Sequence, residues 1–109
     1  MASDFLQGTL DMLILRVLSG GPLHGYAIGQ RIGQMSRALL SIPQGSLYPA
    51  LHRLENRGWL AATWTQTEAG RDAKIYRITA KGRRALDAEV KQWQQLTQAI
   101  GFVLQPAEE

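Results

Sequence analysis

Apolar residues in the first part of the chain follow helical spacing. Residues 10–18 are apolar except at Asp11 and Arg16, and Thr9 stands before them as a potential N-cap. The run is long enough for about three helical turns. The Gly20-Gly21-Pro22 that follows cannot continue a helix without a large cost. We therefore expect a first helix over residues 10–18 that is buried almost all round.

Two further apolar patterns predict helices over residues 24–37 and 44–57. Glycines recur every four residues on one face of the first, which indicates close packing against another backbone: Gly25, Gly29 and Gly33. The second has Pro43 near its first helical position and Gly58 after its end. Its core stripe is Leu47, Ala50, Leu51 and Leu54. Its opposite, polar face carries Gln44, Ser46, Tyr48, Pro49, His52, Arg53 and Asn56.

The last third of the chain predicts a β-hairpin and then a long helix. Residues 59–66 and 74–79 are strand-like and are joined by a glycine-containing stretch. A helix is expected over residues 80–104 with Thr79 as its N-cap. Its apolar positions step by four and three residues, the 3.5 repeat of helices that pack on one another: Leu86, Val90, Trp93, Ile100 and Leu104, with Thr97 in the gap. At about 37 Å this helix exceeds what a small domain needs, so much of it should find a partner.

Three helices, a hairpin and a long helix, in this order, are typical of a winged helix-turn-helix with a dimerisation helix. We expect an α+β, mostly α fold: a winged helix-turn-helix DNA-binding domain over residues 1–79, and a C-terminal dimerisation helix and tail over 80–109, in one structural domain. The polar face of residues 44–57 can lie in a major groove of double-stranded DNA. The alternative is a winged-helix adaptor that binds protein without DNA, for which we would expect an uncharged hairpin and an exposed apolar patch.

Composition excludes several classes of chemistry. The chain has 109 residues, 45% of them apolar, which fits one globular domain. It has no cysteine, and its two histidines lack ligand spacing, so neither a metal nor another cofactor is expected. No catalytic motif occurs, so the chain is not expected to be an enzyme. No membrane span or secretion signal is visible, and the expected location is the cytoplasm.

Charge is unevenly distributed along the chain. The formal net charge is +3, but residues 71–84 carry six cations against Asp72, while residues 85–109 carry Lys91 against four carboxylates. The basic segment includes the second strand of the hairpin. A concentrated basic segment is the electrostatic footprint of a protein that binds a polyanion.

Three sequence blocks resemble the PadR family of bacterial transcriptional regulators. They are GPLHGY at residues 21–26, QGSLYPALHRLE at 44–55 and KIYRITAKG at 74–82. Ala27 and Gln44 depart from the family pattern, where many members carry Glu and Pro. The short length and single C-terminal helix resemble the compact branch of the family. The resemblance implies a homodimeric repressor of a neighbouring operon that binds a pseudo-palindromic operator and, in some members, is released by a small-molecule effector.

Each candidate DNA contact has a structural alternative. The family motif implies that the Tyr48 hydroxyl contacts DNA, but the ring can instead pack beneath the hairpin. Arg53 can reach DNA or pair within its own helix, and Tyr26 can bind a phosphate at a helix start or belong to the core. The expected DNA-binding residues are Tyr26, Gln44, Ser46, Tyr48, His52, Arg53, Arg71 and Lys74.

The expected dimer interface combines the first and last helices, as in the compact branch. Its residues are Leu10, Leu86, Val90, Trp93, Ile100 and Leu104. Two copies of Trp93 could sandwich a flat aromatic or hydrophobic effector. Plain interface packing is the favoured interpretation of Trp93, because the sequence shows no polar groups that converge on it.

Overall fold

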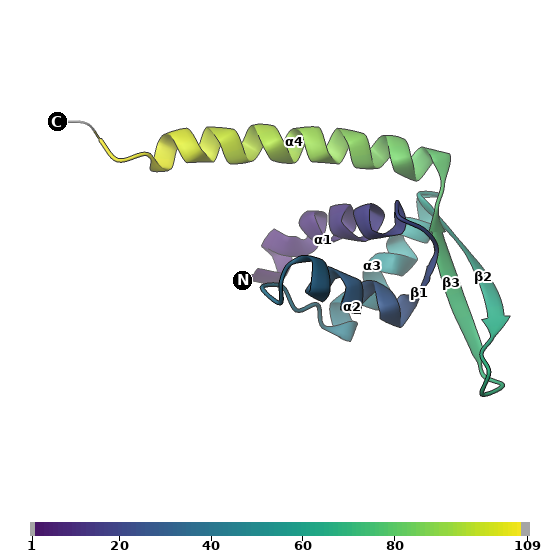
Figure 1. Cartoon of the computed structure of the whole chain (residues 1–109). Coiled ribbons are helices and arrows are strands. Elements are labelled where there is room, and N and C mark those ends of the chain that lie inside the picture. The colour runs from purple at the N-terminus through teal and green to yellow at the C-terminus, as the bar shows by residue number, and fades with distance from the viewer. Residues whose placement is uncertain (1, 108–109) are drawn as a thin grey trace.

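The computed structural model describes the backbone of residues 2–107 and the side chains of residues 8–107. A three-helix body carries a small sheet at one end, and a long helix runs past the body and projects beyond it (Figure 1). In chain order the elements are α1 (Ala2–Leu18), β1 (Leu23–His24), α2 (Gly25–Met35), α3 (Gln44–Asn56), β2 (Leu60–Gln66), β3 (Asp72–Ile78) and α4 (Ala80–Leu104). This is the mostly helical α+β arrangement that the sequence predicts.

The core is built around α1, whose described turns are buried on nearly every side. Within residues 10–18, the side chain of Arg16 is exposed, that of Leu13 is half-buried and the others are buried. The predicted apolar stripe of α3 is confirmed, because its members pack against α1 and α2 with little exposure. The buried side chains of these helices are Leu10, Met12, Ile14, Leu15, Val17, Leu18, Ile28, Ile32, Leu47, Ala50, Leu51 and Leu54. The core therefore holds α3 by one face and leaves the other face outward.

The first helix begins earlier than the sequence pattern predicts. It starts at Ala2, so Thr9 lies inside α1 and is not its N-cap. Thr9 resembles a cap because it stands directly before the apolar run, and both Thr9 and its neighbour Gly8 have low helix propensity. The penalty is only about 1 kcal/mol or less for each residue, which is too little to end a helix whose later turns are buried.

The glycine face of α2 lies against side chains of α3, and the predicted close approach to a backbone is wrong for its first two members. A Cβ atom at Gly25 would lie 3.1 Å from the Tyr48 ring, and one at Gly29 would lie 3.3 Å from the Leu47 side chain. Only at Gly33 is the nearest atom a backbone one, the Leu40 carbonyl oxygen at 3.7 Å. Small residues on α2 thus let the bulky residues of α3 come close.

The sheet has one strand more than the sequence predicts. β2 and β3 pair antiparallel along their whole lengths. On the other edge of β3, β1 pairs through Leu23 opposite Tyr76 and His24 opposite Ile75. A two-residue strand is too short to show alternation in a sequence. Because β1 runs directly into α2, this pairing fixes the start of α2 beside the hairpin.

The start of α4 is held by the predicted cap and by a close contact. The Thr79 hydroxyl accepts a hydrogen bond from the Gly82 amide at 3.0 Å and donates one to the Gly58 carbonyl at 2.7 Å. A Cβ atom at Gly82 would overlap the carbonyl of Trp59. Glycine at this position therefore lets the first turn of α4 lie directly on the chain that leads into β2.

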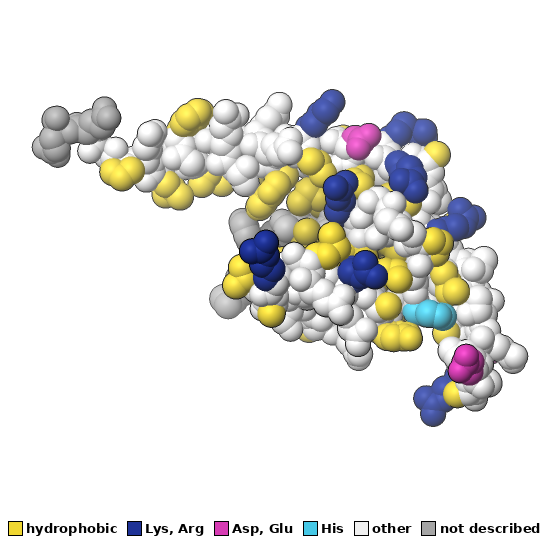
Figure 2. Space-filling model, in the orientation of Figure 1, with side chains coloured by type: hydrophobic (Ala, Val, Ile, Leu, Met, Phe, Trp, Pro, Cys, Tyr) yellow, Lys and Arg dark blue, Asp and Glu magenta, His cyan; other side chains and the backbone are white. Residues whose placement is uncertain are grey.

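The two ends of α4 have different surroundings. Leu86 is only 5% exposed, and Val90 and Trp93 pack partly buried against the core. We call residues 80–93 the near half and residues 94–104 the far half. The far half extends past the three-helix body with hydrophobic side chains uncovered (Figure 2). The molecule is consequently elongated, with extents of 67 × 28 × 23 Å.

Within residues 2–107, none of the helices combines the length and the apolar character that crossing a lipid bilayer requires.

Candidate nucleic-acid interface

The outward face of α3 presents a polar stripe. Gln44, Tyr48, His52 and Asn56 stand four residues apart, and each is exposed. We call these four residues the α3 stripe. Residues spaced by four lie on one side of a helix, and this side is opposite the buried leucines. The stripe can therefore be offered to the edge of a groove along most of the length of α3.

The beginning of α3 has two backbone amides that point out of the helix. The Pro43 carbonyl accepts hydrogen bonds from the amides of Ser46 and Leu47, both at 3.0 Å. The amides of Gln44 and Gly45 precede them in the first turn, where a helix lacks internal acceptors. Nothing in the described structure lies within 4 Å of a Cβ placed on Gly45. The glycine is thus not needed for packing, and its bare backbone lets an anion approach closely.

Gly45 was not among the residues expected from the sequence. Its signal was its place inside a motif on a helix start, but a glycine in a turn-rich connector is usually a turn residue. Ser46, which was expected, is half-buried. Its backbone amide donates to the Pro43 carbonyl, a bond that any residue at this position would make, so a phosphate contact by the Ser46 hydroxyl stays a prediction.

Aromatic rings gather where α2, α3 and β3 meet. The ring of Tyr48 lies against Gly25 and is 42% exposed, so it is neither a core residue nor fully covered by the hairpin. Tyr26 is 56% exposed and stacks on His24 with ring centroids 5.7 Å apart. The interpretation of Tyr26 as a core aromatic is therefore wrong. Both tyrosines are therefore accessible to solvent, Tyr48 as a member of the α3 stripe and Tyr26 at the start of α2.

Lys74 is held by groups of its own chain. Its Nζ donates a hydrogen bond to Glu55 at 3.1 Å and lies over the rings of Trp64 and Tyr76, 5.6 and 5.5 Å from their centroids. The hydrogen bond to Glu55 is the main reason that the pKa of Lys74 is raised above 10.5, against an opposing effect of desolvation. Burial raises the pKa of Tyr76, partly offset by the nearby charge of Lys74. The ammonium group thus ties the hairpin to α3.

Trp64 lies on an open face of the hairpin, where its side chain is 66% exposed on β2. Its ring is a platform for Lys74 and not a core residue. Alternation along a strand indicates that the strand has two faces, but it does not tell which face a tryptophan takes.

Arg53 is turned toward α1. Its guanidinium donates a hydrogen bond to the carboxylate of Asp11 at 2.5 Å, and Arg57 lies 3.8 Å from the same carboxylate. Asp11 is only 6% exposed. A buried carboxylate needs such partners because an unpaired buried charge is costly. Arg53 was expected to face DNA or to pair within its own helix, and instead it locks α3 onto α1.

The hairpin is less basic than the sequence suggests. We call residues 60–78 the wing. The wing carries Arg71, Lys74 and Arg77 against Glu68 and Asp72, a net charge of +1. Among the described side chains, Arg71 at the tip is exposed and forms no ion pair.

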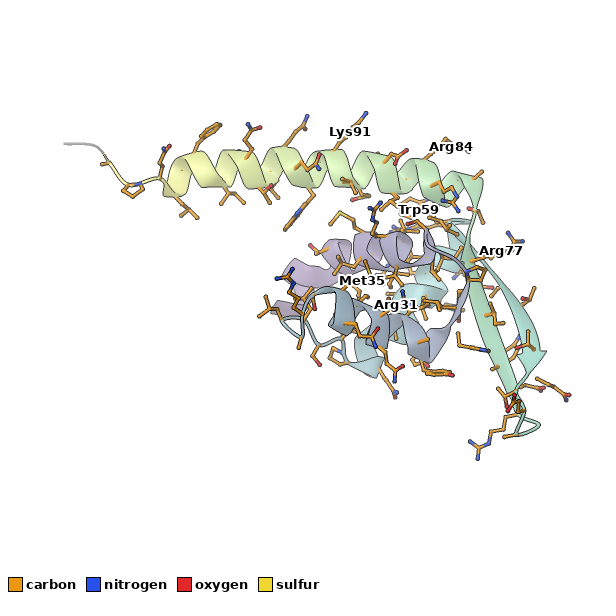
Figure 3. All side chains as sticks on the ribbon, in the orientation of Figure 1. Arg31, Met35, Trp59, Arg77, Arg84 and Lys91 are labelled. Carbon is orange, nitrogen blue, oxygen red and sulfur yellow. The ribbon has the colours of Figure 1, made fainter. Side chains whose placement is uncertain are left out.

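The rest of the basic segment belongs to the first turns of α4: Lys81, Arg83 and Arg84. Arg84 and Lys91 project from α4 on the side away from the three-helix body (Figure 3). The expectation of a basic cluster at the hairpin is therefore wrong for half of its charges. The six cations are close in sequence, but the chain turns at Thr79, so those before it lie on the wing and those after it lie on α4.

Two of the six residues expected at a dimer interface, Val90 and Trp93, are partly buried against the core, and the other four are either buried or exposed. Leu10 and Leu86 are 6% and 5% exposed inside the core of their own chain, so almost none of their surface is left for a partner. Ile100 and Leu104 are 43% and 74% exposed on the far half of α4. The sequence missed three further exposed apolar side chains there, because they lie off the 3.5 repeat: Leu96, Phe102 and Val103.

Comparison with known proteins decides the family. The sequence profile of the transcriptional regulator PadR-like family matches residues 14–88, well over half of the chain. The chain belongs to this family. PadR-family proteins are transcriptional regulators and not enzymes.

Individual relatives agree over nearly the whole chain. A transcriptional regulator of Mycobacterium tuberculosis is 30% identical over 97 residues, which are 89% of this chain and 87% of the relative. The crystal structure of a PadR family transcriptional regulator from Eggerthella lenta has a TM-score of 0.83 at 33% identity, covering 98% of this chain and 91% of the other. A transcriptional regulator from Clostridium thermocellum has a TM-score of 0.86 at 26% identity, covering 94% and 99%.

Proposed function

We propose that this PadR-family regulator is a homodimeric repressor that binds a pseudo-palindromic DNA operator beside the operon it controls. The observation that carries the proposal is the α3 stripe, a continuous polar face on a helix whose other face is fixed in the core. Residues 1–79 form the DNA-binding part, and the C-terminal segment 80–109 carries the dimer contact. Membership of the family supports the regulatory role, and the α3 stripe and the far half of α4 are the surfaces proposed to contact DNA and a second copy of the chain.

The DNA contact divides into base reading and phosphate contacts. The α3 stripe lies in the major groove, where amide and imidazole groups such as those of Gln44 and His52 can hydrogen-bond to base edges. The outward amides of Gln44 and Gly45 bind a phosphate, and Tyr26 and Tyr48 donate their hydroxyl groups beside it. Arg71 reaches the backbone or minor groove from the wing tip. Arg53 and Lys74 act by holding α1 and the wing against α3.

The apolar side of the far half of α4 is the dimer contact. By helical spacing this side carries Leu96, Ile100, Val103 and Leu104, and all four are exposed, whereas the near half packs one side against the core of its own chain. A second copy of the helix can cover the four exposed side chains, with Trp93 packing at the edge of the contact. Two α3 stripes about 34 Å apart would then meet successive turns of the major groove. In the cell such a dimer works in the cytoplasm, where its operator is.

The direct test is binding to the promoter fragment that precedes the chain's own gene. We expect the protein to bind this fragment about 10³-fold or more tightly than a shuffled sequence of the same length and composition. His52→Ala should reduce that ratio, since it removes a base contact, while Gln98→Ala on α4 should not. Equal affinity for the shuffled fragment would contradict sequence-specific regulation.

Gly45 offers a test that separates folding from DNA contact. Gly45→Ala should stabilise α3 by up to about 1 kcal/mol, because alanine favours helix and the Cβ meets nothing. The same Cβ stands where a phosphate approaches, so DNA affinity should fall. Gly8→Ala, an equally unhindered change inside α1, is the matched control and should leave DNA affinity unchanged. Unaltered DNA affinity in Gly45→Ala would remove the start of α3 from the interface.

A winged-helix adaptor that binds another protein remains the second candidate. The exposed apolar far half of α4 and the nearly neutral wing are the features expected of it. The two functions separate in one experiment, because an adaptor keeps its far half available to a partner protein and has no affinity for the promoter fragment.

A further inference from the structure

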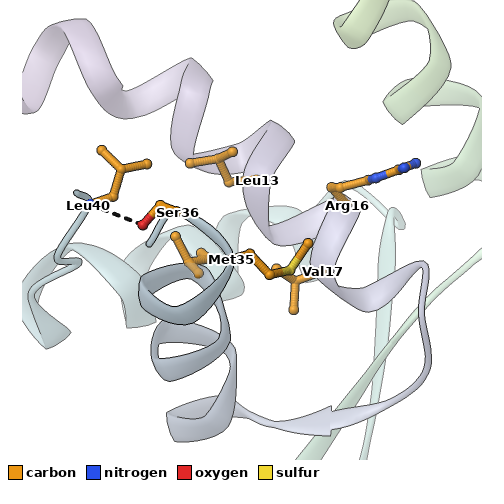
Figure 4. Close-up of a pocket in the computed structure, with 7 residues that line it drawn as sticks. Leu13, Arg16, Val17, Met35, Ser36 and Leu40 are labelled. Atoms are coloured by element: carbon orange, nitrogen blue, oxygen red, sulfur yellow. Dashed lines mark hydrogen bonds between the residues drawn. The ribbon is translucent and has the colours of Figure 1, made fainter. Parts of the chain in front are cut away.

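A pocket lies between α1 and α2, away from the α3 stripe. It holds about 230 Å³ and is lined by Leu13, Val17, Ile32, Met35 and Leu40 (Figure 4). An apolar cavity of about 150 Å³ is enough to bind benzene. The pocket is therefore large enough for a molecule with one substituted aromatic ring.

The two polar residues that line the pocket do not favour a charged or strongly polar ligand. The Ser36 hydroxyl donates to the Gly33 carbonyl and accepts from the Leu40 amide, both at 3.1 Å, so its one donor is already used within the chain. Arg16 contributes its aliphatic stem, and its guanidinium is turned away toward α4 (Figure 4). A neutral apolar molecule matches this lining, because a buried polar group on the ligand would lose its hydrogen bonds to water.

One wall of the pocket is formed by the flexible side chain of Met35. Met35 is 59% exposed at the end of α2, although it lines an apolar pocket. Methionine has three rotatable bonds and a polarisable sulfur, and it adapts to ligands of different shape. A side chain of this kind can adjust its rotamer to the shape of a bound ligand.

The opposite wall belongs to the connector that positions α3. Leu40 is tied to Ser36, and between them Arg37 and Ala38 have φ values of 56° and 65°. This left-handed conformation is unfavourable for residues other than glycine. Three residues after Leu40 the connector reaches Pro43, the N-cap of α3. A displacement of Leu40 therefore acts on a strained turn directly before the DNA-facing helix.

We propose that this pocket is a binding site for a small neutral apolar molecule of aromatic-ring size, and that its occupancy alters DNA binding through the connector of residues 36–43. The second half of the proposal rests on the proposed function. The site is distinct from a sandwich between two copies of Trp93, because none of its lining residues comes from α4.

Toluene is the probe for the site itself, with binding followed through methyl signals in NMR spectra. We expect saturable shifts centred on Met35, Leu40 and Val17. Two variants fill the pocket: Met35→Trp at the exposed wall and Val17→Phe at a buried wall that is 8% exposed. Each should weaken toluene binding at least tenfold while circular dichroism shows a retained fold. Leu39→Trp, a neighbouring residue that is 86% exposed and does not line the pocket, is the matched control and should bind toluene normally.

Several outcomes would overturn the site. Absence of saturable shifts up to the solubility limit of toluene would do so, as would equal binding by both filled variants. Shifts centred on Leu96 and Leu104 would place the ligand on the far half of α4 instead. Binding that appears only after dilution to monomers would assign the pocket to a second copy of the chain.

A separate measurement tests the coupling. Saturating toluene should change the affinity for the promoter fragment at least threefold in the wild type and in Leu39→Trp, but not in Met35→Trp. Toluene binding with unchanged DNA affinity would overturn the coupling and keep the site. Toluene binding by a protein that has no affinity for the promoter fragment would refute the proposed function and leave the site standing.

Discussion

The chain leaves two surfaces uncovered, and they differ in kind. The α3 stripe is polar, short and backed by the core, whereas the far half of α4 is apolar and projects from the body. An apolar surface is stabilised by removal from water, and almost any complementary apolar surface can do this. A polar surface gains little from burial alone and needs a partner that replaces its hydrogen bonds.

The difference indicates which partner each surface takes. A second copy of α4 offers the far half the apolar area it lacks, and a nucleic acid offers the α3 stripe the donors and acceptors of base edges. The two associations should therefore respond differently to salt and to substitution.

The largest effect is expected from charges placed on the apolar surface. Ile100→Asp together with Leu104→Asp should weaken dimerisation on the order of 10³-fold, because each carboxylate would be buried without a partner. Sedimentation velocity over a range of concentrations measures this effect. Gln98→Asp, on the polar side of the same helix, is the control and should keep the dimer. A dimer that survives the double change would place the interface elsewhere.

Trp93 marks the boundary between the packed and the uncovered parts of α4, so its removal should act on both. Trp93→Ala should lower the free energy of unfolding by about 1–3 kcal/mol, less than for a fully buried tryptophan, and should also weaken the dimer. Thermal unfolding and sedimentation give the two quantities. If the dimer stays tight and the melting temperature stays the same, Trp93 is peripheral to both the core and the interface.

On the polar side, the wing should contribute through charge and not through sequence. Arg71→Ala combined with Lys74→Ala should reduce affinity about equally for all DNA sequences and lower the salt slope by about 1 to 2. Of the two single changes, Arg71→Ala should account for most of the change in slope, since Lys74 is already paired with Glu55. A loss confined to one operator variant would instead mean that the wing reads bases.

The smallest effect concerns the pKa of Lys74. Its pKa in the folded protein lies above 10.5 because of Glu55, so the pair stabilises the fold fully below pH 10.5 and this stabilisation is lost as the pH rises through the raised value. Glu55→Gln should lower the pKa of Lys74 and cost roughly 1 kcal/mol or less at pH 7. NMR titration of the Lys74 side chain measures the change in its pKa, and chemical denaturation measures the change in the free energy of unfolding. An unchanged pKa would show that Glu55 does not hold the wing.

Elements with long apolar patterns could be predicted from the sequence, and contacts between elements could not. The helices ending at Leu18, Asn56 and Leu104 follow their periodicity, and Thr79 is a cap that its neighbours reveal. The partner of Arg53 is Asp11, forty-two residues away, and no local pattern indicates it.

The predicted 3.5 repeat of α4 likewise shows that a helix needs a partner without showing which one. Leu86 finds its partner in the core of its own chain, while Leu104 does not. The repeat is identical in both places because it reflects only the helical period. Only the position of α4 relative to α1 distinguishes them.

In the proposed arrangement the α3 stripe binds DNA while the far half of α4 holds a dimer, and one series of salt concentrations tests both contacts. Between 50 and 200 mM salt, affinity for the promoter fragment should fall about 10³-fold if six or more phosphates are contacted, while the dimerisation constant measured in parallel should change little. A promoter affinity that does not respond to salt would contradict the account.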